Sequence, residues 1–294
     1  MPELPEVETI VRDLKKTIVG QTIGSVFVDH AKTVAPLTIK EFELQLKGLK
    51  ISEVSRRAKI IIISLNQISK TAIPYFLLIH LKMTGQLIFT PQKGKIVIGG
   101  HPQPGGATDL PNKFTRINLK FKDGGNLYFN DMRKFGWARL MTEDEKNKTL
   151  KPYGVEPLSV YFTEDILKSI FTRFKNRSIK KALFDQNYIA GLGNIYIDEA
   201  CFISGIKPDK QASLLTDSEI KNLRNAIISV LKLSIKSRGT SARNYVTADG
   251  TKGGFVKHLK VYGREGKECK TCGTLILKIK HAGRGTHFCP ECQK

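Results

Sequence analysis

The chain has 294 residues, enough for one large domain or two of ordinary size with a buried core. Its composition, 40% hydrophobic and 26% charged, excludes a disordered or fibrous protein. Lysine and arginine number 48 against 27 acidic residues, and this net charge of +21 attracts polyanions. Nucleic acid is therefore the first partner to consider, and an anionic membrane surface is the second.

Neither a membrane span nor a signal peptide is expected. The longest uncharged run, residues 96–108, contains two prolines and four glycines, whereas a span needs about 20 apolar residues. The acidic side chains of Glu3, Glu6 and Glu8 have the wrong sign for the start of a signal peptide. We therefore expect a cytoplasmic protein with no membrane partner.

The first half of the chain is predicted to be a helix followed by a β-sandwich or barrel. Residues 3–19 carry apolar side chains at helical spacing and end before Gly20. From residue 22 to residue 141, short runs of β-branched and aromatic residues alternate with turn signals, which is typical of strands. Residues 91–113 are rich in proline and glycine and are expected to form an exposed, structureless insertion.

Beyond a linker at residues 152–157 the pattern becomes helical. Four helices are predicted, beginning near Thr163, Ser178, Asn194 and Asp217. A mobile loop is expected at residues 240–254, followed by a short β-type tail. The fold class is therefore α+β. The predicted domains are residues 1–150 (helix and β-sandwich), 151–254 (helical) and 255–294 (cysteine-containing tail).

The tail carries the strongest motif, C-x2-C-x16-C-x2-C, formed by Cys269, Cys272, Cys289 and Cys292. Two such pairs of thiolates give the tetrahedral sulfur shell that Zn²⁺ prefers, and they leave no open coordination position. The sequence thus predicts one structural Zn²⁺ ion, with a β-hairpin between the pairs. Nine lysines and arginines against three acids in residues 255–294 make this finger a candidate DNA clamp. The fifth cysteine, Cys201, is expected to pack in a helix core.

The opening Met1-Pro2-Glu3-Leu4-Pro5-Glu6 crowds carboxylates and prolines at a helix start. By itself this has an ordinary explanation, because proline fits the first helical turn and acids favour the helix dipole. Together with five further segments, however, it resembles the formamidopyrimidine-DNA glycosylases over nearly the whole chain. The six segments are Pro2-Glu3-Leu4-Pro5-Glu6-Val7-Glu8-Thr9, Arg56-Arg57-Ala58-Lys59, His80-Leu81-Lys82-Met83-Thr84-Gly85, Asp131-Met132-Arg133-Lys134-Phe135-Gly136, Gly191-Leu192-Gly193-Asn194-Ile195-Tyr196, and the finger with Lys280-His281-Ala282-Gly283-Arg284.

The resemblance implies a helix and β-sandwich, then a helix–two-turn–helix domain that ends in a zinc finger. It implies a bacterial, monomeric repair enzyme that acts on double-stranded DNA containing a damaged base and associates with the nucleoid. The expected activities are removal of oxidised purines, namely 8-oxoguanine and formamidopyrimidines, and β,δ-elimination at the resulting abasic site.

The chemistry centres on Pro2. Once Met1 is removed, Pro2 presents a secondary α-amine. The pKa of an α-amine is ~7.7–8.0 and that of a lysine side chain is ~10.4, so a larger fraction of the α-amine is neutral and nucleophilic at neutral pH. Attack at the sugar C1′ expels the base, and the resulting iminium is an electron sink that promotes elimination. The resemblance implies that Glu3 is the general acid/base for sugar opening.

Further roles follow from the resemblance for residues outside the N-terminus. Lys59 matches the proton donor in β-elimination, although a plain phosphate contact is the alternative. Arg284 matches the finger arginine linked to δ-elimination, which we interpret as phosphate clamping and leaving-group stabilisation. Glu6 is expected to touch the lesion or the sugar, unless it is a solvated helix acid.

Access to C1′ requires rotating the nucleotide out of the stack. The resemblance implies that Met83 fills the space that the rotated nucleotide leaves in the stack, that Arg133 contacts the unpaired cytosine, and that Phe135 wedges beside that cytosine. The ordinary alternative for Met83 or Phe135 is a position in the hydrophobic core. Backbone phosphates are assigned to Lys175, Lys180 and Asn194.

Two departures from the family pattern limit the comparison. Residues 91–113 lengthen a connection that is normally shorter. Phe114-Thr115-Arg116 stands where members have His-x-His, so Arg116 is the candidate to replace a DNA-contacting histidine. The loop at residues 241–254, which closes over the extruded base in relatives, cannot be assigned residue by residue.

Two rival functions remain to be weighed. A sister glycosylase of the endonuclease VIII type would prefer oxidised pyrimidines, but the opening from Pro2 and the Arg133-x-Phe135 wedge favour the purine branch. A non-catalytic DNA- or RNA-binding protein would use only the basic surface and the finger. It would need none of Pro2, Glu3 and Lys59, and their joint presence argues against it.

Overall fold

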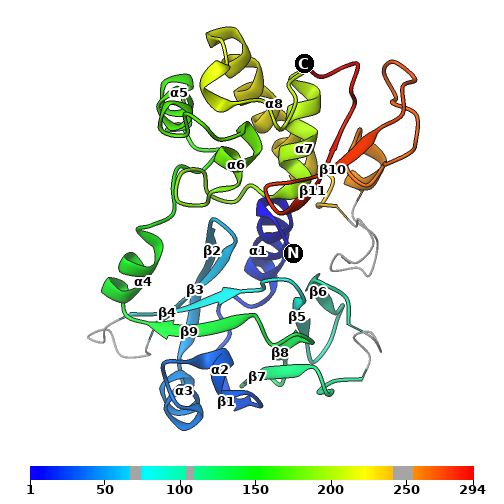
Figure 1. Ribbon diagram of the computed structural model, residues 1–294. Coiled ribbons are helices and arrows are strands. Elements are labelled where there is room, and N and C mark those ends of the chain that lie inside the picture. The colour runs from blue at the N-terminus through cyan, green and yellow to red at the C-terminus, as the bar shows by residue number, and fades with distance from the viewer. Residues whose placement is uncertain (67–73, 104–108, 241–253) are drawn as a thin grey trace. The chain divides into compact units, whose positions relative to one another are not determined.

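The computed structural model describes residues 1–66, 74–103, 109–240 and 254–294 (Figure 1). The chain forms two compact units, of which unit 1 is Met1–Lys151 with Arg238–Gly253 and unit 2 is Pro152–Ser237 with Gly254–Lys294. Of the predicted loop over the extruded base, residues 241–253 lie outside the described residues. Over those residues, no helix is long and apolar enough to cross a membrane.

Unit 1 begins with helix α1 (Leu4–Thr17), as predicted. Glu3 is its N-cap residue, and the Glu6 carboxylate Oε2 accepts a hydrogen bond from the Glu3 backbone N–H at 2.9 Å. This contact satisfies one donor that the helix start would otherwise leave unpaired. The apolar stripe of α1 is buried in the core of unit 1, so the helix is held by packing as well as by its cap.

Two antiparallel sheets follow, as the predicted β-sandwich requires. The five-stranded sheet has the order β1 (Ile23–Val28), β7 (Thr115–Phe121), β8 (Asn126–Asp131), β5 (Gly85–Thr90), β6 (Val97–Gly100). The four-stranded sheet has the order β2 (Lys50–Arg57), β3 (Ile60–Asn66), β4 (Tyr75–His80), β9 (Trp137–Met141). Alternate apolar residues of both sheets share one core with α1, for example Ile61 and Leu119.

The expectation of a structureless insertion at residues 91–113 is wrong at Val97–Gly100, which form strand β6. Strand β6 pairs with β5 there, and a Cβ on Gly99 would lie 2.4 Å from Cγ1 of Ile10 in α1. Gln103 is buried, and its side-chain Nε2 donates to the backbone carbonyl of Thr84 at 2.6 Å. Glycine is needed at position 99 because helix α1 and strand β6 approach closely there. The strand was not predicted because glycine-rich segments usually indicate loops.

Three further helices in unit 1 did not emerge from the periodicity: α2 (Ala31–Val34), α3 (Ile39–Leu46) and α4 (Glu143–Leu150). Two of them carry a signal that the sequence does contain. Thr38 with Glu41 and Thr142 with Glu145 are capping boxes, in which each side chain accepts from the other residue's backbone N–H.

Unit 2 contains the four predicted helices, α5 (Glu164–Arg173), α6 (Ile179–Phe184), α7 (Asn194–Ile203) and α8 (Asp217–Lys236), and two short 3₁₀ turns, η1 (Ala212–Leu214) and η2 (Phe255–His258). The cap of α8 is Thr216, one residue before the predicted Asp217. Cys201 is fully buried in the helical core, as expected. The tail forms the predicted hairpin of β10 (Leu277–His281) and β11 (Arg284–Phe288).

Candidate active site and DNA-contacting residues

The start of α1 gathers the residues predicted to be catalytic within unit 1. Pro2, Glu3 and Glu6 are buried there. Lys59, also buried, occupies the two-residue turn that joins β2 to β3, where Arg57 pairs with Ile60. The charges of Glu3, Glu6 and Lys59 all act on the Met1 α-amine, so these buried groups lie near one point. Burying several ionisable groups in one place is costly, and it is typical of a functional site.

The turn that carries Lys59 is tied to α1 by Arg56. Its Nε donates to Oε2 of Glu8 at 2.8 Å, and its Nη1 donates to the backbone carbonyl of Ala58 at 3.5 Å. Burial alone would raise the pKa of Glu8, but hydrogen bonds and charges from Arg12 and Arg56 lower it below its usual value. Glu8 therefore stays ionised and fixes the hairpin turn beside the helix start.

The electrostatics at the N-terminus favour a neutral amine. Burial lowers the pKa of the Met1 α-amine, and the charge of Lys59 acts in the same direction. Glu3 and Glu6 oppose the shift, but the net effect is a pKa below the usual value. An amine at this place can therefore carry a free lone pair near neutral pH.

Glu6 is neither solvated nor free. Its Oε1 accepts hydrogen bonds from the backbone N–H and the hydroxyl of Thr240, at 2.8 and 3.0 Å. Gly239, the residue before Thr240, has a φ of +84°, and a Cβ on Gly239 would lie 2.9 Å from Oε1 of Glu6. Glu6 thus joins the helix start to the chain that leads into residues 241–253.

The three residues predicted to enter the DNA stack are exposed in unit 1. Met83 is 40% exposed and Phe135 is 53% exposed, although both are large and apolar. The guanidinium carbon of Arg133 lies 4.5 Å from the centre of the Phe135 ring. The alternative that Met83 and Phe135 belong to the core is therefore wrong.

Arg116 does not offer the DNA contact for which it was a candidate. It is 5% exposed and forms an ion pair with Asp29. Its Nε donates to the backbone carbonyl of Asp131 at 2.9 Å. The guanidinium is buried and its donors bind groups of the β-sandwich, so it is not available to a phosphate.

In unit 2, the prediction for Lys180 needs correction. Its side chain is 1% exposed, and its Nζ lies 2.6 Å from Oδ1 of Asp198 in α7. Asp198 Oδ2 accepts from the backbone N–H of His287 at 2.9 Å. Lys180 therefore belongs to a buried network that attaches the β10–β11 hairpin to the helices, which does not fit a phosphate contact.

Asn194 and Arg284 lie at neighbouring positions of this attachment. Asn194 Nδ2 donates to the backbone carbonyl of Gly285 at 2.9 Å. Arg284 is exposed, and its guanidinium carbon lies 4.9 Å from the centre of the Phe184 ring in α6. Lys175 is exposed as well. Arg284 and Lys175 are thus accessible to a phosphate, and Phe184 supports the arginine.

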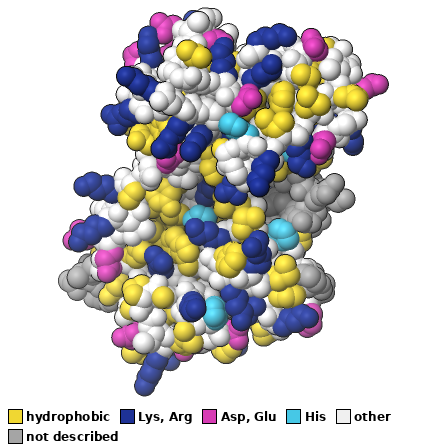
Figure 2. Space-filling model, in the orientation of Figure 1, with side chains coloured by type: hydrophobic (Ala, Val, Ile, Leu, Met, Phe, Trp, Pro, Cys, Tyr) yellow, Lys and Arg dark blue, Asp and Glu magenta, His cyan; other side chains and the backbone are white. Residues whose placement is uncertain are grey.

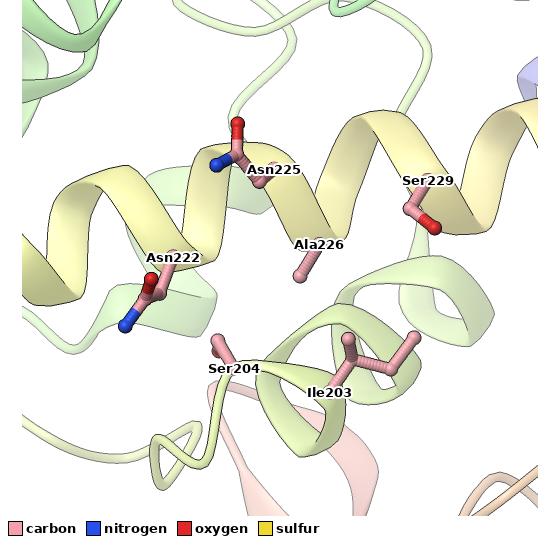
Figure 3. Close-up of a pocket in the computed structure, with 6 residues that line it drawn as sticks. All are labelled: Ile203, Ser204, Asn222, Asn225, Ala226 and Ser229. Carbon is pink, nitrogen blue, oxygen red and sulfur yellow. The ribbon is translucent and has the colours of Figure 1, made fainter.

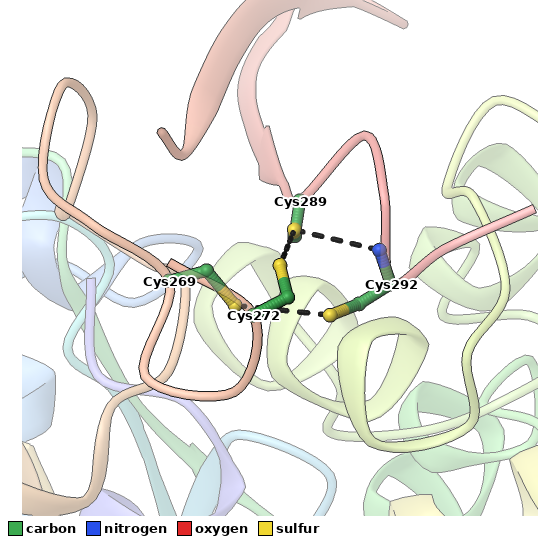
Figure 4. A group of neighbouring side chains, drawn as sticks. All are labelled: Cys269, Cys272, Cys289 and Cys292. Atoms are coloured by element: carbon green, nitrogen blue, oxygen red, sulfur yellow. Dashed lines mark hydrogen bonds between the residues drawn. The ribbon is translucent and has the colours of Figure 1, made fainter. Parts of the chain in front are cut away.

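The four cysteine sulfurs of the tail point toward one another from two turns (Figure 4). All four lie within 4.8 Å of one another, with Sγ–Sγ distances of 3.8 Å for Cys269–Cys292 and 3.5 Å for Cys272–Cys289. Zn–S bonds of about 2.3 Å in a tetrahedron give sulfur separations of about 3.8 Å. The arrangement therefore fits a closed Zn²⁺ site.

The surface has a hollow in unit 2 and many basic side chains. A hollow of about 280 Å³ lies between the end of α7 and α8, lined by Ile203, Ser204, Asn222, Asn225, Ala226 and Ser229 (Figure 3). None of these side chains ionises, so the hollow offers no acid or base. Figure 2 shows lysine and arginine side chains over the visible face of both units, with fewer acidic ones among them.

Three family models match the chain in order. They describe the formamidopyrimidine-DNA glycosylase N-terminal domain (residues 1–138), the H2TH domain of that enzyme (residues 153–246), and a zinc finger found in FPG and IleRS (residues 266–294). The chain belongs to the formamidopyrimidine-DNA glycosylase family. The finger match and the sulfur cluster together establish one structural Zn²⁺ ion held by the four cysteines.

Relatives and solved structures of this family cover the whole chain. The formamidopyrimidine-DNA glycosylase of Pelotomaculum thermopropionicum is 38% identical over 296 residues, covering 100% of this chain and 99% of the relative. That of Exiguobacterium sibiricum is 38% identical over 297 residues, with the same coverage of 100% and 99%. Lactococcus lactis Fpg in complex with abasic-site DNA has a TM-score of 0.85 and 35% identity, covering 99% of each chain.

Several residues that shape this family member's site were missed or left open from the sequence. Asp198 and Phe184 carry no signal in the sequence, because their partners in the finger are distant in the chain. Glu6 was left open, although a glutamate three residues after the start of a helix matches the second half of a capping-box signal. Its second partner, Thr240, carries no local signal at all.

Proposed function

We propose that the protein excises oxidised purines, 8-oxoguanine and formamidopyrimidines, from duplex DNA and then cleaves the strand at the abasic site. The observation that carries this proposal is that Pro2, Glu3 and Lys59 are all buried, and that the charges of Glu3 and Lys59 both act on the amine that precedes α1. Simple DNA binding gives no reason to bury an amine, a carboxylate and an ammonium in one place. We also propose that it works as a monomer on the DNA of the nucleoid.

The first step uses the α-amine of Pro2 after removal of Met1. Its lone pair attacks C1′ of the damaged nucleotide, and the C1′–N bond breaks with its electron pair leaving on the base. The base takes up the proton that the proline nitrogen releases, so the nitrogen regains a lone pair. The pKa of the Met1 α-amine, one residue before Pro2, is lowered mainly by burial, and this environment supports a neutral nucleophile at the start of α1. The covalent bond then joins the proline nitrogen to C1′.

Sugar opening follows through Glu3. Its carboxyl group delivers a proton to O4′ as the C1′–O4′ bond breaks, and the proline nitrogen supplies the electron pair that forms the iminium. Burial of Glu3, which is 4% exposed, supports a role as proton carrier because a buried carboxyl exchanges protons with its neighbours rather than with water.

The iminium then drives strand cleavage. A proton leaves C2′, the electrons flow toward the positive nitrogen, and the 3′-phosphate departs; a second elimination expels the 5′-phosphate, and hydrolysis frees Pro2. We assign proton delivery in the first elimination to Lys59, and stabilisation of the departing phosphate to Arg284. The exposed guanidinium of Arg284 on the Phe184 ring supports the second assignment.

The lesion must leave the stack before this chemistry. We propose that Met83 fills the vacated space, that Phe135 wedges beside it, and that Arg133 donates to the unpaired cytosine. The exposure of two large apolar side chains next to an arginine supports this assignment. Lys175 and Asn194 are proposed to hold backbone phosphates. Zn²⁺ supplies folding energy to the finger and takes no part in the reaction.

The experiment compares cleavage of a duplex with 8-oxoguanine opposite cytosine by the native protein and by a form with an N-terminal extension, with borohydride trapping in parallel. Pro2→Gly should keep some activity through a primary amine, whereas Glu3→Gln should bind DNA and lose base removal. Glu41→Gln, in the capping box of α3, is the matched control. Trapping of the extended form at the native level would refute the mechanism, and a faster reaction on an oxidised-pyrimidine duplex would favour the sister glycosylase.

A further inference from the structure

The two segments that carry Met83 and Arg133 are both crossings between the two sheets of unit 1. Residues 81–84 lead from β4 in the four-stranded sheet to β5 in the five-stranded sheet. Residues 132–136 lead back, from β8 in the five-stranded sheet to β9 in the four-stranded sheet. Gly85 pairs with Asp131 at one end of the crossings, and His80 pairs with Trp137 at the other. The two crossings therefore run side by side.

A buried carboxylate joins the two crossings. Asp131, which is 1% exposed, accepts a hydrogen bond from the Thr84 hydroxyl through Oδ1. The same oxygen accepts from the backbone N–H of Arg133 at 3.2 Å, and Oδ2 accepts from the N–H of Gly136 at 2.7 Å. Thr84, which is 6% exposed, thus holds its own crossing to the one that carries Arg133.

The path of the second crossing leaves little freedom. A Cβ on Gly136 would lie 2.6 Å from Cζ of Phe129 and 3.1 Å from Oδ2 of Asp131. Lys134 adopts a left-handed conformation with φ of 57°, and the Thr84 Oγ1 also lies 3.2 Å from the Arg133 N–H. A tight turn around one carboxylate moves as a body, so a change at Thr84 is transmitted to Arg133.

We propose that Thr84 and Asp131 are positioning residues that make insertion of Met83 and recognition of the opposite base by Arg133 a single coupled event. The inference rests on the proposed function of those two side chains. Both hydrogen-bond partners are buried, and the acceptor is charged, so the contact is strong and its loss is not repaired by water. The base opposite the lesion is then read only when the void is filled.

The test uses Thr84→Val, which has nearly the same shape and removes only the hydroxyl, and Thr84→Ser, which restores it. Single-turnover excision of 8-oxoguanine is measured opposite cytosine and opposite adenine. Thr84→Val should lose roughly tenfold of the preference for cytosine, as expected for one buried charged hydrogen bond, and Thr84→Ser should recover it. Cleavage of a preformed abasic site in single-stranded DNA, which has no opposite base, should stay at the native rate.

Coupling is measured by a double-mutant cycle of Met83→Ala and Arg133→Ala. In the native background the two effects should be non-additive, and in the Thr84→Val background they should become additive. Asp123→Asn is the matched control, because the Asp123 Oδ1 accepts from the Gly125 N–H at 3.0 Å in the β7–β8 turn. Asp131→Asn keeps the shape of the carboxylate, and it serves as a second variant if Thr84→Val lowers the melting temperature too far for the assay.

The outcomes test the coupling and the proposed function separately. If Arg133→Ala abolishes the preference for cytosine while Thr84→Val and Asp131→Asn retain it, the coupling is refuted and the proposed function stands. If the native protein does not excise 8-oxoguanine opposite cytosine, the proposed function itself fails. Additive effects of Met83→Ala and Arg133→Ala in the native background also overturn the coupling.

Discussion

The carboxylate of Glu6 holds Thr240, 234 residues further along the chain, through two hydrogen bonds to the backbone N–H and the hydroxyl. Its other oxygen accepts from the backbone N–H of Glu3, next to Pro2. One buried side chain therefore fixes both the helix start, where the proposed nucleophile lies, and the chain entering residues 241–253. Glu6 is 3% exposed, so the alternative of a solvated helix acid is wrong, and contact with the lesion or the sugar stays a prediction.

Glu6→Gln should impair base excision and leave the fold intact. The amide has one accepting oxygen where the carboxylate has two, so either the Thr240 contacts or the Glu3 contact is lost. Loss of hydrogen bonds to a charged group is worth about 1.5–3 kcal/mol, which corresponds to roughly 10- to 150-fold in the single-turnover rate. Glu145→Gln, in the capping box of α4, is the control for helix capping alone. Equal effects of the two substitutions would show that Glu6 is only a cap.

Cys272→Ser should remove the zinc and with it DNA binding. Four thiolates close the metal shell, so the finger folds only with the ion present. Unit 1 has its own hydrophobic core and should remain folded. Metal content measured on the purified variant checks the first statement, and circular dichroism checks the second. Stoichiometric zinc in the variant would contradict the assigned ligand set.

Arg133→Ala should weaken recognition of the opposite base more than it weakens non-specific binding. A bidentate arginine–base contact is worth ~1–3 kcal/mol of discrimination, whereas overall affinity depends on many phosphate contacts. The measurement is binding to abasic-site duplexes with cytosine or adenine opposite, compared with binding to undamaged DNA. An unchanged ratio would remove Arg133 from this role.

The features that could be predicted from the sequence are those encoded locally. The stripe of α1, the start of α6 at Ser178 and the spacing of the four cysteines each fall within a short stretch of chain, and all three were confirmed. Strand β6 was missed because glycine and proline usually signal a loop. Glycine is required at position 99 because α1 packs closely against the strand there, and this contact is visible only in the folded chain.

The errors in the site have a different cause. Lys180 stands in a basic segment, and nothing in the sequence shows that its side chain meets Asp198, which lies on the following helix. Arg116 lies on strand β7, and it is buried there in an ion pair with Asp29. The Thr84–Asp131 contact joins residues 47 positions apart. Charged residues were thus located by motif, but whether they face solvent depends on tertiary packing.

His80 should make the stability depend on pH in a defined window. Burial, together with the charges of Lys82 and Lys59, lowers the pKa of His80 to about 3. Its Nδ1 accepts the backbone N–H of Lys82 at 3.0 Å, which requires the neutral ring. As the pH falls below about 6.5, the unfolded chain binds a proton that the folded chain refuses, so the free energy of unfolding decreases by up to about 1.4 kcal/mol per pH unit.

The substitution His80→Gln isolates this contribution. Urea denaturation between about pH 6.5 and pH 4 should give a shallower loss of stability for the variant than for the native protein. The difference in slope is the measured quantity, because other groups titrate equally in both proteins. Identical slopes would mean that His80 is not held neutral by the fold.

Lys180 and Lys175 should respond in opposite ways when each is replaced by methionine. Lys180→Met leaves the Asp198 carboxylate buried without its cation, and breaking such a pair costs about 3–5 kcal/mol of stability. A buried ammonium displaces no counterions from DNA, so the salt dependence of binding should not change once the variant is folded. Lys175, which is exposed, should show the reverse: unchanged stability, and a decrease of about one in the slope of log affinity against log salt concentration. Thermal melting and binding titrations at several salt concentrations give both quantities on the same samples. A decrease in the slope with no loss of stability for Lys180→Met would restore the phosphate contact first predicted for it.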